Sequence, residues 1–561
     1  MYIRRKKTPN SPRQSIQIVE GYRDDQGNVK QRIVRHLGVF MDEVEEAKLV
    51  ALAQDLILKI KADREAASPQ GSLLFENYDH SLQDPKKGRP KRKSLSEIIP
   101  VAEVKLEDIV EDRRIIEGVH EVGGFVYNQM NFDQILTKKR DAQILKDITL
   151  ARMVEPNSKR GLAHYLKEQF DMEHDLDAIY RMMDKLHDQI PKIKELAFRS
   201  TLALIPNQEI NLVFFDVTTL YFESTEVDDL RAFGYSKDHR FNTTQLVLAL
   251  ATNEDGLPLG YELFPGNTAE VKTLLTAIKS WESFMRIRDV CFVADRAMFS
   301  QDNLETLDAS GYRYIVAAKL KTLKTRVQEQ ILDGENYAPC LMGNDFTWIA
   351  EFEHEGKRLI TSYKSKRAMN DAKERQNILT KIEKTIGQKG STKKLISNSG
   401  IKKYTSSDHS ITYLDGNKIQ LDAMWDGLHG VITNDPNITA QEAIAKYSRL
   451  WIIEQAFRIN KHNLQMRPIF HWTPRRIEAH IAICYMSFAM LKHMEYKVAL
   501  TQKISINNMV ELLIGVQSSI LKHTKTGDLY KLPGSMKNEA RKIYKTFGLK
   551  RSQKPEIYLP L

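Results

Sequence analysis

Three acidic side chains stand at positions where a protein could use them to hold metal ions. Asp216 follows the apolar run Ile210–Phe215, and Asp295 follows the apolar run Val290–Ala294. Glu454 lies far downstream, in a segment that is otherwise rich in apolar residues. Three carboxylates brought together supply the oxygen ligands that Mg²⁺ prefers, and a pair of such ions can cleave a phosphodiester bond. The pattern therefore predicts a two-metal site for phosphoryl transfer, in which Mn²⁺ can replace Mg²⁺.

The segment around Glu454 predicts a buried helix with one polar stripe. Tyr447, Glu454 and Lys461 are spaced seven residues apart, which keeps their side chains aligned on one helical face. Arg458 joins that face one turn after Glu454. The surrounding residues are apolar, so we expect the helix to be buried, and a buried carboxylate must be paired or bound to a metal. The alternative to a metal is a structural salt bridge from Glu454 to Arg458 or Lys461.

The elements that must position the two aspartates follow an α/β order. After the helical pattern of residues 101–208, three strands are followed by helix, strand, helix and strand. This βββαβαβ order resembles the RNase H-like fold, and Asp216 and Asp295 would end two strands of its mixed sheet. Strands commonly end on a polar residue, so neither aspartate is informative by itself. The expected elements are strands Leu212–Phe215, Thr244–Leu250 and Leu257–Phe264, helix Ala269–Met285, strand Val290–Ala294, helix Gln301–Ala309 and strand Tyr312–Ala317.

A mainly β insertion separates Glu454 from this core. Its expected elements are strands Phe346–Glu353, Arg358–Tyr363, Ser410–Leu414 and Lys418–Ala423, and the charged helix Ala368–Ile386. The helix that carries Glu454 is predicted from Ala440 to about Leu464, because Thr439 and Glu442 form a capping-box pattern. Further helices are expected at Ile477–Met494, Ile506–Leu521 and Met536–Phe547.

The N-terminal region combines a hairpin, a helix and a basic run. Alternating residues on either side of a Gly-Asn turn predict the hairpin, and helical spacing follows from Asp42 to about Glu65. The basic run Lys86–Lys93 is expected to be a solvated linker. Its Lys-Gly-Arg-Pro core also resembles an AT-hook, which would place basic side chains in the DNA minor groove; these are Arg89, Lys91 and Arg92.

Composition favours a folded protein with a polyanionic partner. The chain has 561 residues, 42% of them hydrophobic, and 83 Lys and Arg against 73 Asp and Glu give a net charge of +10. That excess favours nucleic acid as a partner, although a basic protein without such a partner is the alternative. The three cysteines are far apart, so neither a zinc site nor a disulfide framework is expected. We see neither a signal peptide nor a membrane span, and expect a soluble cytoplasmic protein.

These patterns predict an α/β protein with an RNase H-like catalytic core and accessory regions. The helices expected over residues 101–208 suit DNA binding, and a generic helical bundle fits almost equally well. The expected segments are an N-terminal hairpin and helix (1–70), a basic linker (71–100), a helical DNA-binding region (101–208), the first part of the core (209–320), the β-rich insertion (321–438), the second part of the core (439–495) and a C-terminal helical region (496–561).

Around its three acids the chain resembles bacterial insertion-sequence transposases of the DDE type. The branch that it resembles carries the signature Tyr-x-x-Arg-x-x-x-Glu-x-x-x-x-x-x-Lys and a β-rich insertion before the glutamate. Tyr447, Glu454 and Lys461 fall at the signature positions, and the two aspartates lie in Asp-Val-Thr-Thr and Ala-Asp-Arg-Ala-Met-Phe. Leu450 stands where the family has arginine, which leaves Arg449 or Arg458 to supply that charge.

The resemblance implies a metal-dependent enzyme that acts on double-stranded DNA. Such enzymes bind the terminal inverted repeats of their element as a homodimer, cut the ends and join the 3′-ends to target DNA. The implied DNA contacts are Tyr447, Arg449, Arg458 and Lys461, and the implied location is the prokaryotic cytoplasm, at the nucleoid. Two alternatives remain: a nuclease of the same fold that never joins DNA ends, and a non-catalytic DNA-binding relative.

Overall fold

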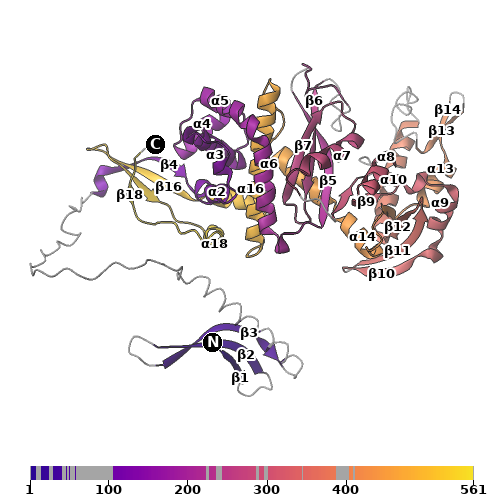
Figure 1. Cartoon of the computed structure of the whole chain (residues 1–561), viewed down its shortest axis with the longest axis horizontal. Coiled ribbons are helices and arrows are strands. Elements are labelled where there is room, and N and C mark those ends of the chain that lie inside the picture. Colours follow the sequence, from indigo (N-terminus) through magenta and orange to yellow (C-terminus); the bar gives the residue numbers. More distant parts are fainter. Residues whose placement is uncertain are drawn as a thin grey trace, which may run out of the picture. The chain divides into compact units, whose positions relative to one another are not determined.

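The computed structural model divides the chain into two compact units, residues 1–101 and 102–561 (Figure 1). It describes residues 2–7, 14–23, 29–40, 46, 50, 53, 57, 105–222, 226–234, 243–285, 290–295, 301–343, 345–386, 403–408 and 411–559. The basic run Lys86–Lys93, with Arg89, Lys91 and Arg92, lies outside these residues.

The first unit is built on a three-stranded antiparallel sheet. Its strands, in the order β1-β2-β3, are β1 (Tyr2–Lys7), β2 (Gln14–Arg23) and β3 (Val29–Phe40). The pairing of β2 with β3 confirms the predicted hairpin, and β1 was not anticipated. Ile16 and Ile18 of β2 pack with Ala53, one of four described residues of the next segment, all of which are helical. The helical residues Val50, Ala53 and Ile57 therefore pack against this sheet.

The second unit is organised around a nine-stranded mixed sheet. Strands β5, β8 and β9 are parallel to one another, and the other pairs are antiparallel. The strand order is β10 (Ala338–Met342), β11 (Asp345–His354), β12 (Lys357–Tyr363), β15 (Leu428–Thr433), β9 (Arg313–Ala317), β8 (Cys291–Ala294), β5 (Leu212–Tyr221), β6 (Gln245–Thr252) and β7 (Pro258–Pro265).

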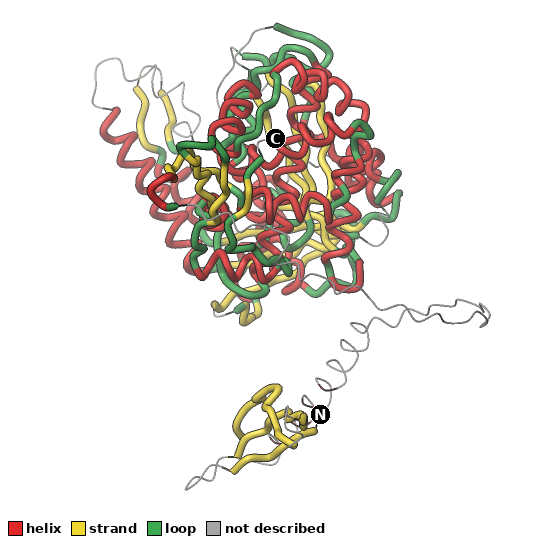
Figure 2. Tube along the Cα trace, turned by 90° about the vertical axis from the view of Figure 1, so that its left-hand side faces the viewer, coloured by secondary structure: helices red, strands yellow, loops and turns green. Residues whose placement is uncertain are grey.

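Helices cover this sheet (Figure 2). Its central strands β5 and β6 are buried along nearly their whole length, as expected for strands that are covered on both faces. Alternate residues of β5 face opposite ways: Val213 and Phe215 pack with α7 (Glu270–Trp281) and α8 (Gln301–Ala309). Leu212, Phe214 and Leu220 pack instead with α15 (Trp451–Arg458) and α16 (Pro474–Ala499). The sheet therefore lies between two helical layers.

The segment that was expected to be a β-rich insertion adds strands to this sheet. Strands β10, β11, β12 and β15 extend it beyond β9, and a separate two-stranded sheet joins β13 (Thr405–Asp408) to β14 (Ile411–Leu414). The expected charged helix is α10 (Ser365–Ile386). The strand expected at Lys418–Ala423 is wrong: Asp415 caps a helix there by accepting hydrogen bonds from two backbone N–H groups, and the helix is α13 (Gly416–Ala423).

A helical bundle precedes the sheet in the sequence and packs against its long helix α16. Figure 1 shows α2 to α5 on one side of α16 and the sheet on the other. The predicted helices Leu176–Leu186 and Ile190–Leu204 are confirmed. The bundle consists of α2 (Gly124–Gln129), α3 (Lys139–Val154), α4 (Lys159–Phe170), α5 (Leu176–Leu186) and α6 (Ile190–Leu204). Among the described residues, no helix is long and apolar enough to cross a membrane.

The C-terminal region contains strands where only helices were expected. The helix predicted over Ile506–Leu521 ends as α17 at Ile514, because Gln517–His523 forms β16 and pairs with β4 (Ile109–Ile116). Pairing with a strand some 400 residues earlier outweighs the local helical pattern. The four-stranded sheet is completed by β17 (Leu529–Pro533) and β18 (Glu556–Ile557), and α18 (Asn538–Thr546) lies between them in the sequence.

Candidate active site

Asp216 and Asp295 lie on neighbouring parallel strands. Phe215 of β5 is paired in register with Ala294 of β8, so each aspartate follows one member of the same pair. The expectation that Asp216 ends its strand is wrong, because β5 continues to Tyr221 alongside β6. It occupies a position in the row of side chains that faces α15, and Asp295 follows the corresponding row of β8. The two carboxylates therefore belong to the same side of the sheet.

Glu454 comes to that side from helix α15, but the helix is not buried all round. Ile452, Ile453, Ala456 and Phe457 pack into the core, and α15 lies against β5 and β6. Glu454 is exposed. The prediction of a buried carboxylate is therefore wrong, because the four apolar side chains cover only one face of the helix and leave the other open to solvent.

The long helix predicted through Glu454 is broken into three pieces. The capping box at Thr439 is present and starts α14 (Ala440–Ser448). After a break, α15 begins at Trp451 and is followed by a π-helical turn, Ile459–Asn463. The alignment of Tyr447, Glu454 and Lys461 on one continuous α-helix is therefore wrong, since each lies on a different piece. A π turn at this place widens the helix just where Lys461 leaves it.

The Tyr447 hydroxyl feels the charges of all three acids. Burial raises the pKa of its hydroxyl to about 12, and the charges of Asp295, Glu454 and Asp216 raise it as well. A single side chain is thus within electrostatic reach of all three carboxylates. These acids come from strands β5 and β8 and helix α15.

Two further groups near Tyr447 were missed in the sequence. Arg367, near the start of α10, lowers the pKa of Tyr447, which places a positive charge near the acids. The ring of His429, on β15, lies 5.0 Å from the Tyr447 ring between centroids. Burial, Arg367 and Lys364 lower the pKa of His429 to about 4, so it is neutral near pH 7. The run Lys364-Ser-Lys-Arg367 was the available signal, but only the extended sheet brings it to this site.

The remaining predicted DNA contacts differ in their surroundings. Arg449 binds the turn between β6 and β7: its Nη1 donates to the Glu254 carboxylate at 2.9 Å and its Nη2 to the Glu254 carbonyl at 2.7 Å. Arg458 is exposed, and among the described residues it forms no ion pair with Glu454. Lys461 is half-buried. Leu450, at the place of the family arginine, packs against the hydrophobic core.

The three acids suit a divalent metal by chemistry, although they are not gathered around one. All are carboxylates, and Asp295 and Glu454 are exposed enough for an ion to reach them. Asp216 is half-buried, and one of its oxygens accepts the Val217 N–H at 2.7 Å. In the part of the chain that the structure describes, no three His, Cys, Asp or Glu side chains are already grouped at metal-binding spacing. A metal bound here would have to draw the three carboxylates together.

Comparisons with known proteins give two family matches. The family model described as "Transposase DDE domain" matches residues 207–490, and that described as "IS1634 family transposase, N-terminal domain" matches residues 3–67. No curated protein matches the chain.

Two solved structures show weak similarity. One is a piggyBac transposase synaptic complex with hairpin DNA, with a TM-score of 0.35, 9% identity, and coverage of 71% of this chain and 77% of that one. The other is a Mos1 transposase paired-end complex with the left transposon end, with a TM-score of 0.14, 15% identity, and coverage of 31% and 57%.

Proposed function

Because this chain belongs to the DDE transposase family, we propose that it cuts DNA at the ends of its own insertion sequence and joins the freed 3′-ends to target DNA. The observation that supports this proposal is that Asp216, Asp295 and Glu454 come from one side of the sheet and all act electrostatically on Tyr447. DDE transposase domains use divalent metal ions to cut and join DNA.

The proposed catalytic core is RNase H-like. The strand order β7-β6-β5-β8-β9, with β6 antiparallel to β5 and β8 parallel to it, supports this assignment. The insertion of residues 321–438 then separates two parts of the core, 209–320 and 439–495. It is a functional part of the site in this proposal, because β15 and α10 bring His429 and Arg367 to Tyr447.

In this proposal Asp216, Asp295 and Glu454 hold two Mg²⁺ ions, which Mn²⁺ can replace. When bound, such a pair activates the attacking water or 3′-hydroxyl and stabilises the leaving oxygen. The protein itself has to hold the carboxylates and orient the DNA. Tyr447 stays protonated near neutral pH because its pKa is about 12. It therefore serves as a hydrogen-bond donor to the DNA and not as a general base.

Basic side chains around the site position the DNA by its phosphates. Arg458 and Lys461 follow Glu454 in the sequence, and Arg449 would have to leave Glu254 to join them. The bundle of residues 101–208 and the basic run with Arg89, Lys91 and Arg92 would bind further along the terminal inverted repeat. The DNA-bound enzyme is a homodimer that acts at the bacterial nucleoid.

A strand-transfer assay tests the proposed function. The substrate is DNA that includes the sequences flanking the coding region, labelled at its 3′-ends and mixed with Mg²⁺ and a target plasmid. We expect the label to become covalently attached to the plasmid, and Glu454→Gln to abolish cleavage and transfer together. Cleavage without transfer would instead identify a nuclease. Binding without either reaction would identify a non-catalytic relative.

A further inference from the structure

A cavity of about 430 Å³ lies where helices α3, α4, α5 and α16 meet the segment that follows the π turn. One of its lining residues, Phe470, is 60% exposed. Its lining includes three basic side chains, two of them deeply buried. The residues that matter here are Arg152, Ser158, Lys159, Arg160, His471 and His480.

Lys159 and Arg152 are buried cations, each only 2% exposed. Lys159 Nζ lies 3.1 Å from His480 Nδ1, and this imidazole carries no negative charge. Arg152 donates to the carbonyls of Asn157 and Gln465 at 2.7 Å, while its Nε has no hydrogen-bond partner. Among the described residues, neither cation forms an ion pair with a carboxylate. Two basic side chains are therefore buried at this cavity without a carboxylate partner among the described residues.

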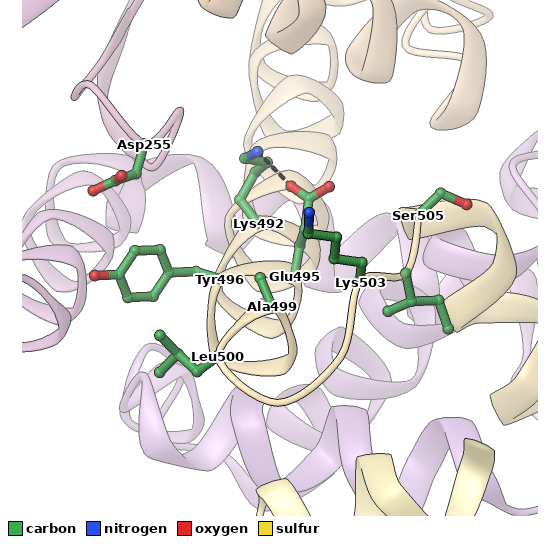
Figure 3. A pocket seen from close by; sticks show the side chains of 9 residues that line it. Asp255, Lys492, Glu495, Tyr496, Ala499, Leu500, Lys503 and Ser505 are labelled. Carbon is green, nitrogen blue, oxygen red and sulfur yellow. Dashed lines mark hydrogen bonds and ion pairs between the residues drawn. The ribbon is translucent and has the colours of Figure 1, made fainter. Parts of the chain in front are cut away.

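Such an arrangement is costly, since a buried charge without a partner loses its hydration and gains little in return. The pKa of Lys159 is lowered to about 7 by burial first and by Arg152 second. The pocket in Figure 3 shows the usual solution: Lys492, which is also buried, is paired with Glu495 at 2.5 Å. Unlike Lys492, the basic side chains of the Lys159 cavity have no carboxylate partner among the described residues, which leaves that place for an anion from outside the chain.

The cavity is connected to the candidate active site through β5. Beyond Asp216 this strand runs to Tyr221, whose ring lies 5.0 Å from the Arg467 guanidinium, and the next residue, Phe222, bridges to Ile469. Residues 467–471 then lead into the cavity wall. Five residues of strand span roughly 17 Å, which corresponds to about five base pairs of duplex DNA.

We propose that this cavity binds one backbone phosphate of the same DNA that is cut at Asp216, Asp295 and Glu454. Lys159 and Arg160 contact the phosphate, and the N-terminus of α4, which Ser158 caps, faces it with backbone N–H groups. Helix α4 starts at this cavity, and the buried side chains of Lys159 and Arg152, whose Nε has no hydrogen-bond partner, line the same cavity. This inference rests on the proposed function for the identity of the DNA, and its test does not require catalysis.

The test compares two lysines of one helix in full-length protein. Lys159→Met removes the buried charge and keeps much of the side-chain volume. Lys167→Met removes an exposed charge of α4 that pairs with Glu173 outside the cavity. Both are made in a Glu454→Gln background so that the DNA stays intact. Binding of a fluorescent duplex that includes the flanking end sequence is measured by anisotropy over a series of salt concentrations.

We expect Lys159→Met to weaken binding about tenfold, the value of one charge-assisted hydrogen bond. It should also lower the slope of log K against log[salt] by about one, as expected when one phosphate is no longer neutralised. A methylphosphonate scan then identifies the phosphate: at one position the neutral linkage weakens binding by Lys167→Met protein and adds nothing in Lys159→Met protein. Equal binding by the two variants, or additive losses at every position, would overturn the proposal.

Two further measurements, of thermal unfolding and of DNA cleavage, separate the possible causes of weaker binding. Lys159→Met should unfold at the same temperature as the parent or higher, because it removes an uncompensated buried charge, so weaker binding is not a folding defect. If the expected binding pattern appears but the parent with Glu454 restored cuts no DNA, only the proposed function fails. If that parent cuts DNA and Lys159→Met binds normally, only the phosphate site fails. If no protein binds DNA, both fail.

Discussion

Phe215 and Ala294 are partners in the only stretch where β5 runs parallel to β8 in the described structure, and each is followed by an aspartate. Asp216 and Asp295 therefore start from adjacent positions on one side of the sheet. Two like charges so placed repel each other unless a cation or a proton intervenes. This relationship makes the pair, and not either acid alone, the unit on which metal binding depends.

Replacing one acid of the site should remove most of the activity. We expect Asp216→Asn and Asp295→Asn each to slow DNA cleavage at least roughly a thousandfold, since losing one metal ligand costs about 4 kcal/mol of transition-state stabilisation. Single-turnover cleavage of end-sequence DNA measures this. Asp302→Asn, on the exposed surface of α8, is the matched control and should cleave as the parent does.

Metal binding should be visible without DNA. Mn²⁺ at a hundred times its dissociation constant stabilises the folded state by about 2.7 kcal/mol, so the thermal unfolding midpoint should rise and fall again on addition of EDTA. Asp216→Asn should raise the midpoint of the metal-free protein, because it relieves repulsion from Asp295 and Glu454, and should abolish the response to Mn²⁺. An identical response in parent and variant would show that the ion binds elsewhere.

The pair Arg449 and Glu254 gives opposite predictions for two alanine variants. If Arg449 leaves Glu254 to bind DNA, Arg449→Ala weakens binding several-fold and lowers the salt slope by about 0.9. Glu254→Ala then strengthens binding, because it frees the guanidinium. A purely structural pair would instead give two variants that each lose less than about 1 kcal/mol of stability and keep the parent salt slope.

DNA binding should depend on pH through Lys159. Its pKa is about 7 in the free protein, and a bound phosphate would raise it, so binding takes up a proton and weakens as the pH rises above about 7. The neighbouring groups are Arg152 on α3, His480 and Cys484 on α16, and His471. Burial lowers the pKa of His471 to about 3, and that of His480 well below 6.5, so neither gains charge in this range.

Anisotropy titrations from pH 6.5 to 9 test this dependence, with Lys159→Met expected to show a flatter profile. The same lysine affects stability without DNA. Because its folded pKa is depressed from 10.5, the folded protein binds fewer protons than the unfolded chain between about pH 7 and 10.5. Its contribution to the free energy of unfolding therefore rises with pH across that window, and Lys159→Met should remove it.

The basic run Lys86–Lys93 should contribute to affinity without sequence preference. Changing Arg89, Lys91 and Arg92 to glutamine should weaken binding to specific and random duplexes alike. It should also lower the salt slope by about 0.9 for each phosphate that these side chains neutralise in the parent protein. Competition titrations with A·T-rich and G·C-rich DNA would also separate minor-groove recognition from simple charge attraction. An unchanged slope would exclude contact between this run and DNA.

The sequence by itself determined the elements whose side-chain pattern is local. The strands around Asp216 and Asp295, the helices of residues 176–204 and the capping box at Thr439 all follow from the spacing of apolar and capping residues over a few turns or strand positions. The prediction that Asp216, Asp295 and Glu454 hold the metal ions comes from the same local patterns together with the family signature.

Only the tertiary structure decided what surrounds those elements. The exposure of Glu454, the pairing of β16 with β4 and the continuation of the sheet into the insertion depend on contacts between residues far apart in the chain. Lys159 and His480 are 321 residues apart in the sequence, and the spacing of apolar residues cannot predict a contact between them. The spacing of apolar residues predicts which side of a helix or strand is buried, but the partner that covers this side depends on the whole fold. A buried basic side chain indicates a binding site only when its partners in the structure are known.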